Sequence, residues 1–402
     1  MSERVSDTTL LELPAPWSHI TLQSLAEKAA LEAPARPFLA DCPRREQWNG
    51  VEPRVLNCDT FLRSAYFLGA QLRSLGVNPG DRVLILLPNC VEHFLAVLAC
   101  RLMGAVPAIG PIDETPDYLR ACAERIQAAV VLTCARVGDM ALGEKARLVA
   151  ARALCVRGIA GFGFDLVEGI VSLEGWSEED VDPLPDLTCH QGDDALITFS
   201  RVADGPLAAL RTEGQVIAEA LALFSVLRLD GRRGLVSLMQ PGASATFAAS
   251  LPLALHTGAR VRLLGPYDRE ALVDVMTEVP NSFVFAPDHF LSTLDPAVFP
   301  PGLFANAAGF LALTRIDAPK ASILKPGPFK GALAFDFSEG GMMTRLAWPI
   351  DGRIDLPHRY DHPMESVLPE EVPMLEWSEA GLSGYGAPRL IRKGSKRTEA
   401  AA

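Results

Sequence analysis

The sequence predicts an α/β protein with two doubly wound βαβ halves, each built on a mostly parallel sheet, and a less regular C-terminal segment. Apolar runs that do not alternate with polar residues, such as 83–87, indicate strands covered on both faces. Segments with apolar residues three and four positions apart separate these runs and predict amphipathic helices. The succession occurs on both sides of an acidic, turn-rich stretch at 158–192, which predicts the two halves.

The first half is expected to open with a helix over 22–33, which Pro34 ends. A second helix follows from apolar residues at steps of three and four between Phe61 and Leu75, with Asp59 as its N-cap and Gly76 as its stop. The further elements expected in this half are a strand at 83–87, a helix from Pro88-Asn89 to Gly104, a strand at 106–109, a helix at 116–127 and a strand at 129–133.

The second half repeats the pattern. Strands are expected at 195–199, 234–239, 260–264, 282–286 and 332–337, and helices at 213–227, 245–256 and 268–278. We therefore divide the chain into an N-terminal tail at 1–16, a first half at 17–190 that includes an irregular linker at 158–190, a second half at 191–350, an irregular segment at 351–388 and a mobile basic tail at 389–402.

Composition excludes several classes of protein. Of the 402 residues, 49% are hydrophobic and 21% charged, which excludes a mainly disordered chain. The net charge of −12 argues against nucleic acid as a partner, since phosphate binding needs a basic face. No apolar run approaches the ~18 residues of a transmembrane segment, and 1–13 does not resemble a secretory signal. We expect a cytoplasmic protein.

The cysteines and histidines do not predict a metal site. Eight cysteines stand singly, without any C-x-x-C pair, and the seven histidines show no metal-binding spacing. We expect buried, reduced thiols.

Ligands of doubly wound sheets bind at the carboxyl ends of the strands, so three loops between strand and helix are the candidate sites: 200–206, 240–245 and 338–341. The second loop contains Gly242, Ala243 and Ser244, in a Gly-Ala-Ser-Ala-Thr sequence similar to the nucleophile elbow of serine hydrolases. Thr246 stands where the second glycine of an elbow should be, and no Asp and His partners are evident. A hydrolase is therefore a minor alternative.

Several segments resemble the adenylate-forming (AMP-binding) superfamily, which includes acyl- and aryl-CoA synthetases and the adenylation domains of peptide synthetases. The similar segments, in order and at the expected spacing between about 20 and 350, are 75–83, 87–89, 104–107, Ser250 with Leu253, 258–261 and 285–287. The resemblance implies the fold of the large N-terminal domain of these enzymes. It also implies ATP or AMP with Mg²⁺ as cofactors and an acyl or aryl carboxylate as a ligand.

The phosphate loop of that family is rich in Ser, Thr and Gly and ends in Pro-Lys-Gly. In this chain only Ser200 and Pro206 keep the pattern, while Arg201 and Asp204 replace glycines and Leu207 replaces the lysine. The resemblance makes Ser200 and Arg201 the candidate nucleotide contacts. A carboxylate at position 204 would repel polyphosphate, so the loop is degenerate.

A second family motif, Tyr-Gly-x-Thr-Glu, has a counterpart near the end of the second half. Ser338 and Glu339 keep the chemistry of its last two positions, which implies contacts with the α-phosphate and with Mg²⁺. Asp336 replaces the glycine and adds negative charge. Alternatively, Ser338 and Glu339 only cap a turn. The resemblance places the candidate acyl pocket at Phe335 together with three loop residues, Gly242, Ala243 and Ser244.

The later motifs of the family have no counterpart. The aspartate that binds the ribose is missing, and so is the small C-terminal domain with its lysine. These losses favour a non-catalytic homologue that binds an acyl group or a protein partner, either an active synthetase or a carrier protein. The alternative is an ATP-dependent carboxylate-adenylating ligase that borrows its C-terminal domain from a separate chain. A homo-oligomer is compatible with both.

Overall fold

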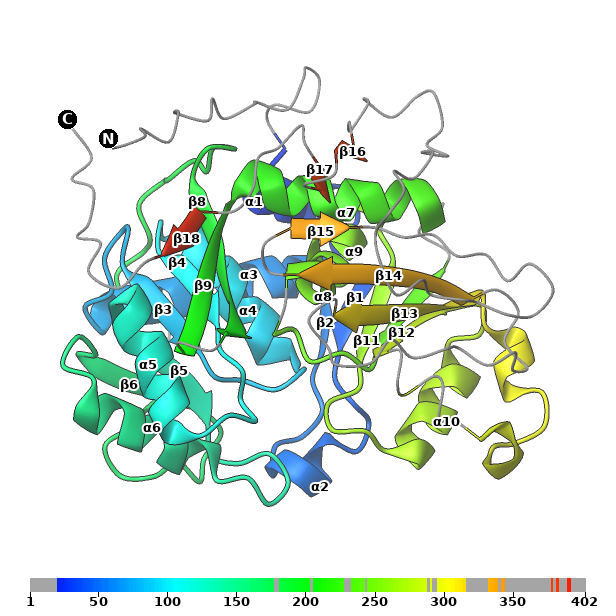
Figure 1. Ribbon diagram of the computed structural model, residues 1–402, viewed down its shortest axis with the longest axis horizontal. Helices are drawn as coiled ribbons and strands as arrows, with labels where there is room; N and C mark the ends of the chain where they lie inside the picture. Colours follow the sequence, from blue (N-terminus) through cyan, green and yellow to red (C-terminus); the bar gives the residue numbers. More distant parts are fainter. Residues whose placement is uncertain are drawn as a thin grey trace.

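The computed structural model describes residues 20–176, 181–202, 205–227, 233–242, 244–287, 290, 295–315, 332–338, 341–343, 377–378, 381–382 and 389–391. Within these residues, two eight-stranded sheets lie side by side with helices around them, sheet 1 on the left and sheet 2 on the right of Figure 1. The predicted α/β class with mostly parallel sheets is confirmed. The predicted N-terminal tail at 1–16 lies outside the described residues.

Sheet 1 has the strand order β18-β9-β8-β4-β3-β5-β6-β7. Its strands from β8 to β7 are parallel, whereas β9 is antiparallel to both β8 and β18. The strands are β3 (Arg82–Ile85), β4 (Val106–Ile109), β5 (Ala128–Cys134), β6 (Gly158–Phe162), β7 (Val171–Ser172), β8 (Asp194–Val202), β9 (Gly205–Thr212) and β18 (Arg389–Ile391).

Sheet 2 has the order β15-β14-β13-β12-β10-β11-β1-β2, and only its edge strands β15 and β2 are antiparallel to their neighbours. Its strands are β1 (Pro37–Ala40), β2 (Val55–Asn57), β10 (Gly234–Ser237), β11 (Arg260–Leu263), β12 (Phe283–Pro287), β13 (Gly309–Arg315), β14 (Ala332–Ser338) and β15 (Gly341–Met343). A separate pair is formed by β16 (Trp377–Ser378) and β17 (Gly381–Leu382).

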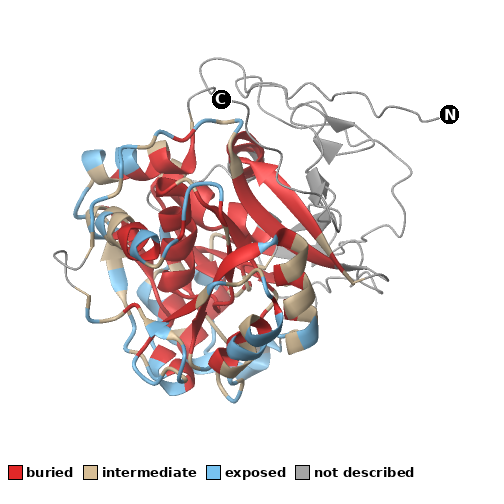
Figure 2. Ribbon diagram, turned by 90° about the vertical axis from the view of Figure 1, so that its left-hand side faces the viewer, coloured by how far each residue is buried: buried red, intermediate tan, exposed pale blue. Residues whose placement is uncertain are grey.

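Helices cover the sheets and connect them. All twelve residues of α4 are buried. Figure 2 shows in red that the buried residues form the interior of the described part of the chain. The helices are α1 (Leu22–Glu32), α2 (Arg45–Asn49), α3 (Cys58–Ser74), α4 (Val91–Leu102), α5 (Pro116–Ile126), α6 (Leu142–Arg152), α7 (Glu213–Leu227), α8 (Ser244–Ala248), α9 (Leu251–Thr257), α10 (Arg269–Glu278), η2 (Pro296–Val298) and η3 (Leu303–Asn306). Within the described part of the chain, no helix is long and apolar enough to cross a lipid bilayer.

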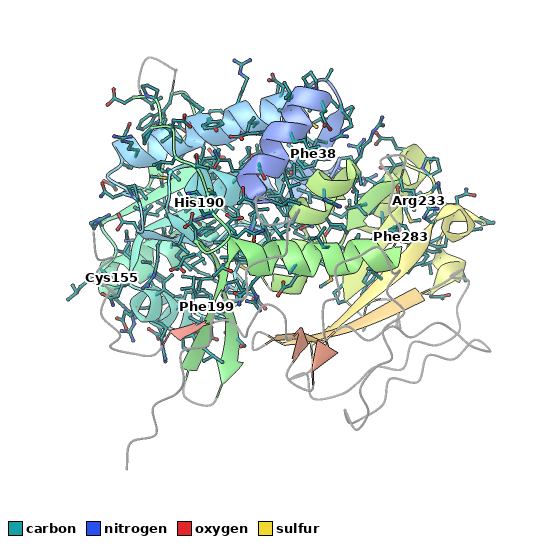
Figure 3. The ribbon with its side chains drawn as sticks, turned by 90° about the horizontal axis from the view of Figure 1, so that it is seen from above. Phe38, Cys155, His190, Phe199, Arg233 and Phe283 are labelled. Atoms are coloured by element: carbon teal, nitrogen blue, oxygen red, sulfur yellow. The ribbon has the colours of Figure 1, made fainter. Side chains whose placement is uncertain are left out.

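Helix α7 lies across both halves. It contacts β8 and β9 of sheet 1 as well as α8 and α9, which lie beside sheet 2. Seen from above, Phe199 of β8 and the Arg233–Phe283 pair of sheet 2 lie on opposite sides of α7 (Figure 3), and the Arg233 guanidinium sits 5.7 Å from the centre of the Phe283 ring. The helix therefore joins the two sheets on the side shown at the top of Figure 1.

The start of α3 differs from the prediction. Its N-cap is Asn57, whose side chain accepts a hydrogen bond from the backbone N–H of Thr60 at 2.8 Å, while the Thr60 hydroxyl accepts from the backbone N–H of Asn57 at 3.0 Å. This reciprocal pair satisfies two otherwise unpaired donors. The predicted N-cap, Asp59, is wrong; it lies in the first turn, where a negative charge still favours the helix dipole.

The single helix expected at 245–256 is two helices, α8 and α9. Ser250 leaves the helical conformation, with φ −111° and ψ −91°, and Pro252 follows in the first turn of α9. Proline has no N–H to continue the hydrogen-bond ladder, so a new helix starts there instead. Gly258 ends α9 in the left-handed conformation, φ +76°, as the sequence predicts.

The two sheets do not follow the two halves of the sequence. Strands β8 and β9, from the predicted second half, complete sheet 1, whereas β1 and β2, from the first half, complete sheet 2. The stretch at 158–190, expected to be irregular, begins with β6. The sequence pattern does not indicate this strand, because its two glycines and one alanine interrupt the run of large apolar residues. The residue bounds of the predicted domains stay a prediction.

The basic tail expected to be mobile at 389–402 begins with an ordered strand. Arg389, Leu390 and Ile391 form β18 and pair with the outer edge of β9. An unpaired edge strand leaves backbone donors and acceptors free, and β18 covers three residues of that edge.

All eight cysteines are free, and seven of them are buried, as the sequence predicts; that the thiols are reduced stays a prediction. Burial raises the pKa of the Cys100 thiol to about 12 and that of Cys134 to about 12. These thiols are therefore protonated and unreactive at neutral pH.

Candidate functional site

The carboxyl ends of the strands of both sheets meet at one place, which is the candidate functional site. The connection after β3 reaches into sheet 2, where the side-chain amide of Asn89 donates hydrogen bonds to the carbonyls of Ser237, at 2.9 Å, and Leu264, at 3.1 Å. In the opposite direction, the Gln240 amide donates to the carbonyl of Leu87 at 2.9 Å. These contacts bring the loops after β3, β10 and β11 together, where ligands of doubly wound sheets bind.

The first sheet is tightly packed where these loops leave it. The backbone N–H of Gly110, just after β4, donates to the carbonyl of Ile85 at 2.9 Å. A Cβ at Gly110 would lie 2.5 Å from a methyl carbon of Leu86 and 3.1 Å from one of Leu84, so a larger residue would force these two buried side chains to shift. Glycine at this position therefore leaves room for the leucine side chains at the end of β3.

His93 supports the same connection from within α4. Its side chain is fully buried, and Nδ1 lies 3.2 Å from the carbonyl oxygen of Leu87. Because a carbonyl only accepts, Nδ1 carries the proton, and burial lowers the pKa of His93 to about 4, so the ring is neutral. The Leu87 carbonyl thus accepts from both His93 and Gln240. Sequence reasoning gave neither side chain this role, although Gln240 opens the candidate loop at 240–245 and a histidine within an apolar helix was a signal.

The first candidate loop differs from its prediction. Between β8 and α7 lies a second strand, β9, so Ser200 and Arg201 belong to a β-hairpin and not to a strand-to-helix loop. Ser200 pairs with Leu207, Arg201 with Pro206 and Val202 with Gly205. Ser200 is only 7% exposed, and its carbonyl accepts a hydrogen bond from the Tyr118 hydroxyl at 3.2 Å. The connecting residues 203–204, Asp204 included, lie outside the described residues.

The described backbone of this hairpin does not fit a nucleotide phosphate loop. A phosphate-binding loop turns several successive N–H groups toward one anion, whereas successive N–H groups of a strand point in opposite directions. Residues 200–202 and 205–207 are paired strand, and Leu207 brings no positive charge to the position of the family lysine. ATP therefore has no phosphate cradle in these residues, and the roles of Ser200 and Arg201 stay predictions.

The other candidate residues lie along one edge of sheet 2. Gly242 follows β10, and its N–H donates to the carbonyl of Gln240 at 2.7 Å, which makes a tight turn before Ser244 opens α8. Ser338 ends β14, which runs parallel to β10 within the same sheet, so Gly242 and Ser338 follow strand ends at the same edge. Phe335 lies earlier on β14, opposite Leu313 of β13.

The chain reverses direction directly after Ser338. Ser338 pairs with Gly341 across the antiparallel strands β14 and β15, which agrees with the turn expected there. Ala243 and Glu339 lie outside the described residues, so the acyl pocket and the Mg²⁺ ligand stay predictions. Among the residues that the structure describes, no group of three His, Cys, Asp or Glu side chains could hold a metal ion.

A buried ionic cluster lies next to the site, between β1 and the start of α4. Arg45 bridges the carboxylates of Asp41 and Glu92, all three at most 1% exposed, and Arg54 connects Glu92 to Glu174. Burial would raise the pKa of Glu92, but Arg45 and Arg54 outweigh it and lower that pKa. Because the charges are paired with each other, we assign the cluster a structural role.

Two joined α/β sheets with a loop-lined junction at their carboxyl ends are the fold of the large N-terminal domain of adenylate-forming enzymes. The sequence model of the AMP-binding enzyme family matches residues 26–307, and the chain belongs to this family. The resemblance stated from the sequence is thereby confirmed.

Relatives and solved structures agree with this assignment. Over 102 residues the chain is 32% identical to a 2-hydroxy-7-methoxy-5-methyl-1-naphthoate–CoA ligase of Streptomyces carzinostaticus. This aligned region is 25% of this chain and 16% of the relative. It is 37% identical over 102 residues to 4-coumarate–CoA ligase 2 of Oryza sativa subsp. japonica, with the same shares of 25% and 16%. The fold is similar to a benzoate CoA ligase of Burkholderia xenovorans, with a TM-score of 0.62 and 15% identity over 80% of this chain and 61% of that one. The matches to these two curated ligases thus span only 16% of their length.

Proposed function

We propose that this chain is a non-catalytic member of the AMP-binding family that binds an acyl or aryl carboxylate, or an acyl-carrying protein partner, without activating it with ATP. The observation that carries the proposal is the hairpin of β8 and β9, whose paired strands occupy the positions of the phosphate loop. In the described residues of this hairpin, 200–202 and 205–207, the paired backbone gives no converging donors to a triphosphate.

Charge supports the same conclusion. Adenylation requires donors and cations that stabilise the negative charge on the phosphates in the transition state. At the loop positions Leu207 replaces the cation, and Asp204 adds a negative charge. Like charges in contact at a poorly solvated site are strongly unfavourable, so both substitutions oppose ATP in the same direction.

The carboxylate ligand is proposed from the loop beside α8. The family resemblance assigns Gly242 and Ser244 to the acyl pocket, and Ser338 ends a strand at the same sheet edge, which supports this proposal. The names of three similar proteins mention naphthoate, coumarate and benzoate, while other relatives are acetyl-coenzyme A synthetases, so we test aromatic carboxylates first and aliphatic ones beside them. The partner, if acyl-bearing, would be a carrier protein or an active synthetase.

The experiment that tests the proposal is titration calorimetry of ATP with Mg²⁺, with the benzoate CoA ligase of Burkholderia xenovorans as the positive control. We expect binding to the control and none to this chain at millimolar ATP. ATP–pyrophosphate exchange, measured with benzoate and 4-coumarate, should also be absent.

Micromolar ATP binding would overturn the non-catalytic proposal. Pyrophosphate exchange that starts when the separately produced C-terminal domain of an active ligase is added would instead establish the alternative, a ligase completed by a second chain. Binding of an aromatic carboxylate without ATP supports the proposal as stated.

A further inference from the structure

The short segment of Leu87, Pro88 and Asn89, here named the Leu87–Asn89 clamp, follows β3 of sheet 1 and holds the ends of two strands of sheet 2. Two of its hydrogen bonds leave Asn89 and one arrives at Leu87, at distances between 2.9 and 3.1 Å. Asn89 is 2% exposed and Leu87 is 1% exposed. The two bonds of Asn89 are buried and so protected from competition by water, whereas the Gln240 bond is half-buried.

The loop that the clamp holds leads into a short helix. After β10 the chain makes a tight turn and enters α8, which has only five residues. A helix of this length is not stable by itself, so its position depends on the neighbours that fix it, among them α7 and α9. Before the helix, the hydrogen bonds to neighbouring segments include the Asn89 bond to the Ser237 carbonyl and the bond from the Leu238 N–H to the Phe285 carbonyl at 2.8 Å. The Gln240 bond to the Leu87 carbonyl lies nearest to α8 among these bonds.

His93 makes the acceptor of this bond rigid. The Leu87 carbonyl is held by the buried ring of His93 on α4, a helix buried along its whole length. The Gln240 amide thus bonds to an oxygen that is already oriented. A change at Gln240 is therefore transmitted to the loop and not to the core of sheet 1.

We infer that Gln240 and Asn89 are positioning residues, which hold the loop at 238–242 in place for carboxylate binding through the Leu87–Asn89 clamp. The inference rests on the proposed function, because it takes this loop to line the acyl pocket. The family resemblance marks Gly242, Ala243 and Ser244 for that pocket, whereas Gln240 and Asn89 act on its position.

The first test measures hydrogen–deuterium exchange of the amides at 238–250 in Gln240→Met, which keeps the side-chain length but cannot donate to Leu87. We expect exchange to quicken about three- to tenfold there, as for the loss of one hydrogen bond of ordinary net strength. The matched control is Gln71→Met, because the Gln71 amide also donates to a backbone carbonyl, that of Leu173, at 2.9 Å. This control should leave exchange at 238–250 unchanged.

A second variant has almost the same shape as the wild type. Gln240→Glu cannot donate a hydrogen bond to Leu87 at neutral pH, because a glutamate with an ordinary pKa of about 4.3 is ionised there. Its loop amides should therefore exchange at pH 7 as fast as those of Gln240→Met, and His93 is neutral at this pH, since its pKa is about 4. Wild-type exchange of this loop in both Gln240 variants would overturn the inference.

The ligand measurement separates the inference from the proposed function. Benzoate, 4-coumarate and decanoate are titrated into the wild type, Gln240→Met and Gln71→Met. A dissociation constant raised about three- to tenfold in Gln240→Met alone supports positioning. If the wild type binds none of these probes, the proposed carboxylate pocket fails, and the exchange experiment still decides whether the clamp orders the loop. Unchanged affinity in Gln240→Met, with the wild type binding, overturns the role of Gln240 in binding.

Discussion

Replacing Glu213 by glutamine should destabilise the protein far more than an equivalent change on the surface. Glu213 opens α7 and is fully buried, and its carboxylate pairs with Arg101 at 2.6 Å, whose side chain is 3% exposed. The second carboxylate oxygen accepts the backbone N–H of Leu22 at 3.1 Å, so one side chain ties α1, α4 and α7 together. Glutamine cannot neutralise the guanidinium and leaves it buried without its counter-charge.

The size of the effect follows from that burial. Breaking a buried ion pair by removing one partner costs about 3–5 kcal/mol, because the remaining charge is uncompensated. Arg101 keeps its bonds to the carbonyls of Ala105 and Asp194, so we expect a cost of about 3 kcal/mol, at the lower end of that range. The control is Glu144→Gln, which removes an exposed pair with Arg147 at 2.8 Å and should cost about 0.5 kcal/mol or less.

Urea unfolding followed by circular dichroism measures both variants. The midpoint of Glu213→Gln should fall strongly with little change in the slope, while that of Glu144→Gln should stay near wild type. Equal costs for the two variants would refute the reasoning that burial, and not pairing alone, determines the contribution.

Three more predictions concern single side chains. Because burial lowers the pKa of His93 to about 4, the unfolded chain binds more protons than the folded one between pH 6.5 and 4, and stability should fall by about 2 kcal/mol from pH 7 to pH 5. Urea unfolding at both pH values should show this loss in the wild type and lack it in His93→Phe. Asn57→Ala, which removes the N-cap of α3, should cost about 1 kcal/mol in the same assay; no loss would contradict the observed cap. Gly265→Ala puts a Cβ 2.6 Å from the Trp48 ring and should cost about 1–3 kcal/mol. The control Gly158→Ala, with nothing within 4 Å, should lower the melting temperature little, and equal losses would contradict the packing argument.

Elements with a local signal could be predicted from the sequence. The strand at 106–109 and the helix at 213–227 have the expected bounds, because their apolar pattern and flanking residues are complete within the segment. The strand β9 was missed because it begins with Gly205-Pro206, a pair that indicates a turn. Its strand character comes from β8 and β18 on either side, which lie elsewhere in the sequence.

In the candidate site, too, features with a local sequence signal could be predicted and contacts between distant segments could not. The sequence predicts which loops follow which strands, and the structure places Gly242 and Ser338 at one sheet edge. The clamp could not be predicted, since Asn89 and Leu264 are 175 positions apart in the chain. His93 and Gln240 also meet only through the carbonyl of Leu87, a backbone group that carries no sequence signal.

The exchange of strands between the halves has a consequence for how the chain folds as it is made. Leu39 of β1 pairs with Val261 of β11. Strand β1 is therefore synthesised early, but its partner β11 is synthesised only after more than 200 further residues. At ~5–20 residues per second this interval is on the order of 10–40 seconds. During this time the apolar side chains of Phe38 and Leu39, both 1% exposed in the folded protein, have no strand of sheet 2 against them except β2. Synthesis halted before β11 would leave an aggregation-prone edge, and fragments divided near residue 190 would not fold as two separate units.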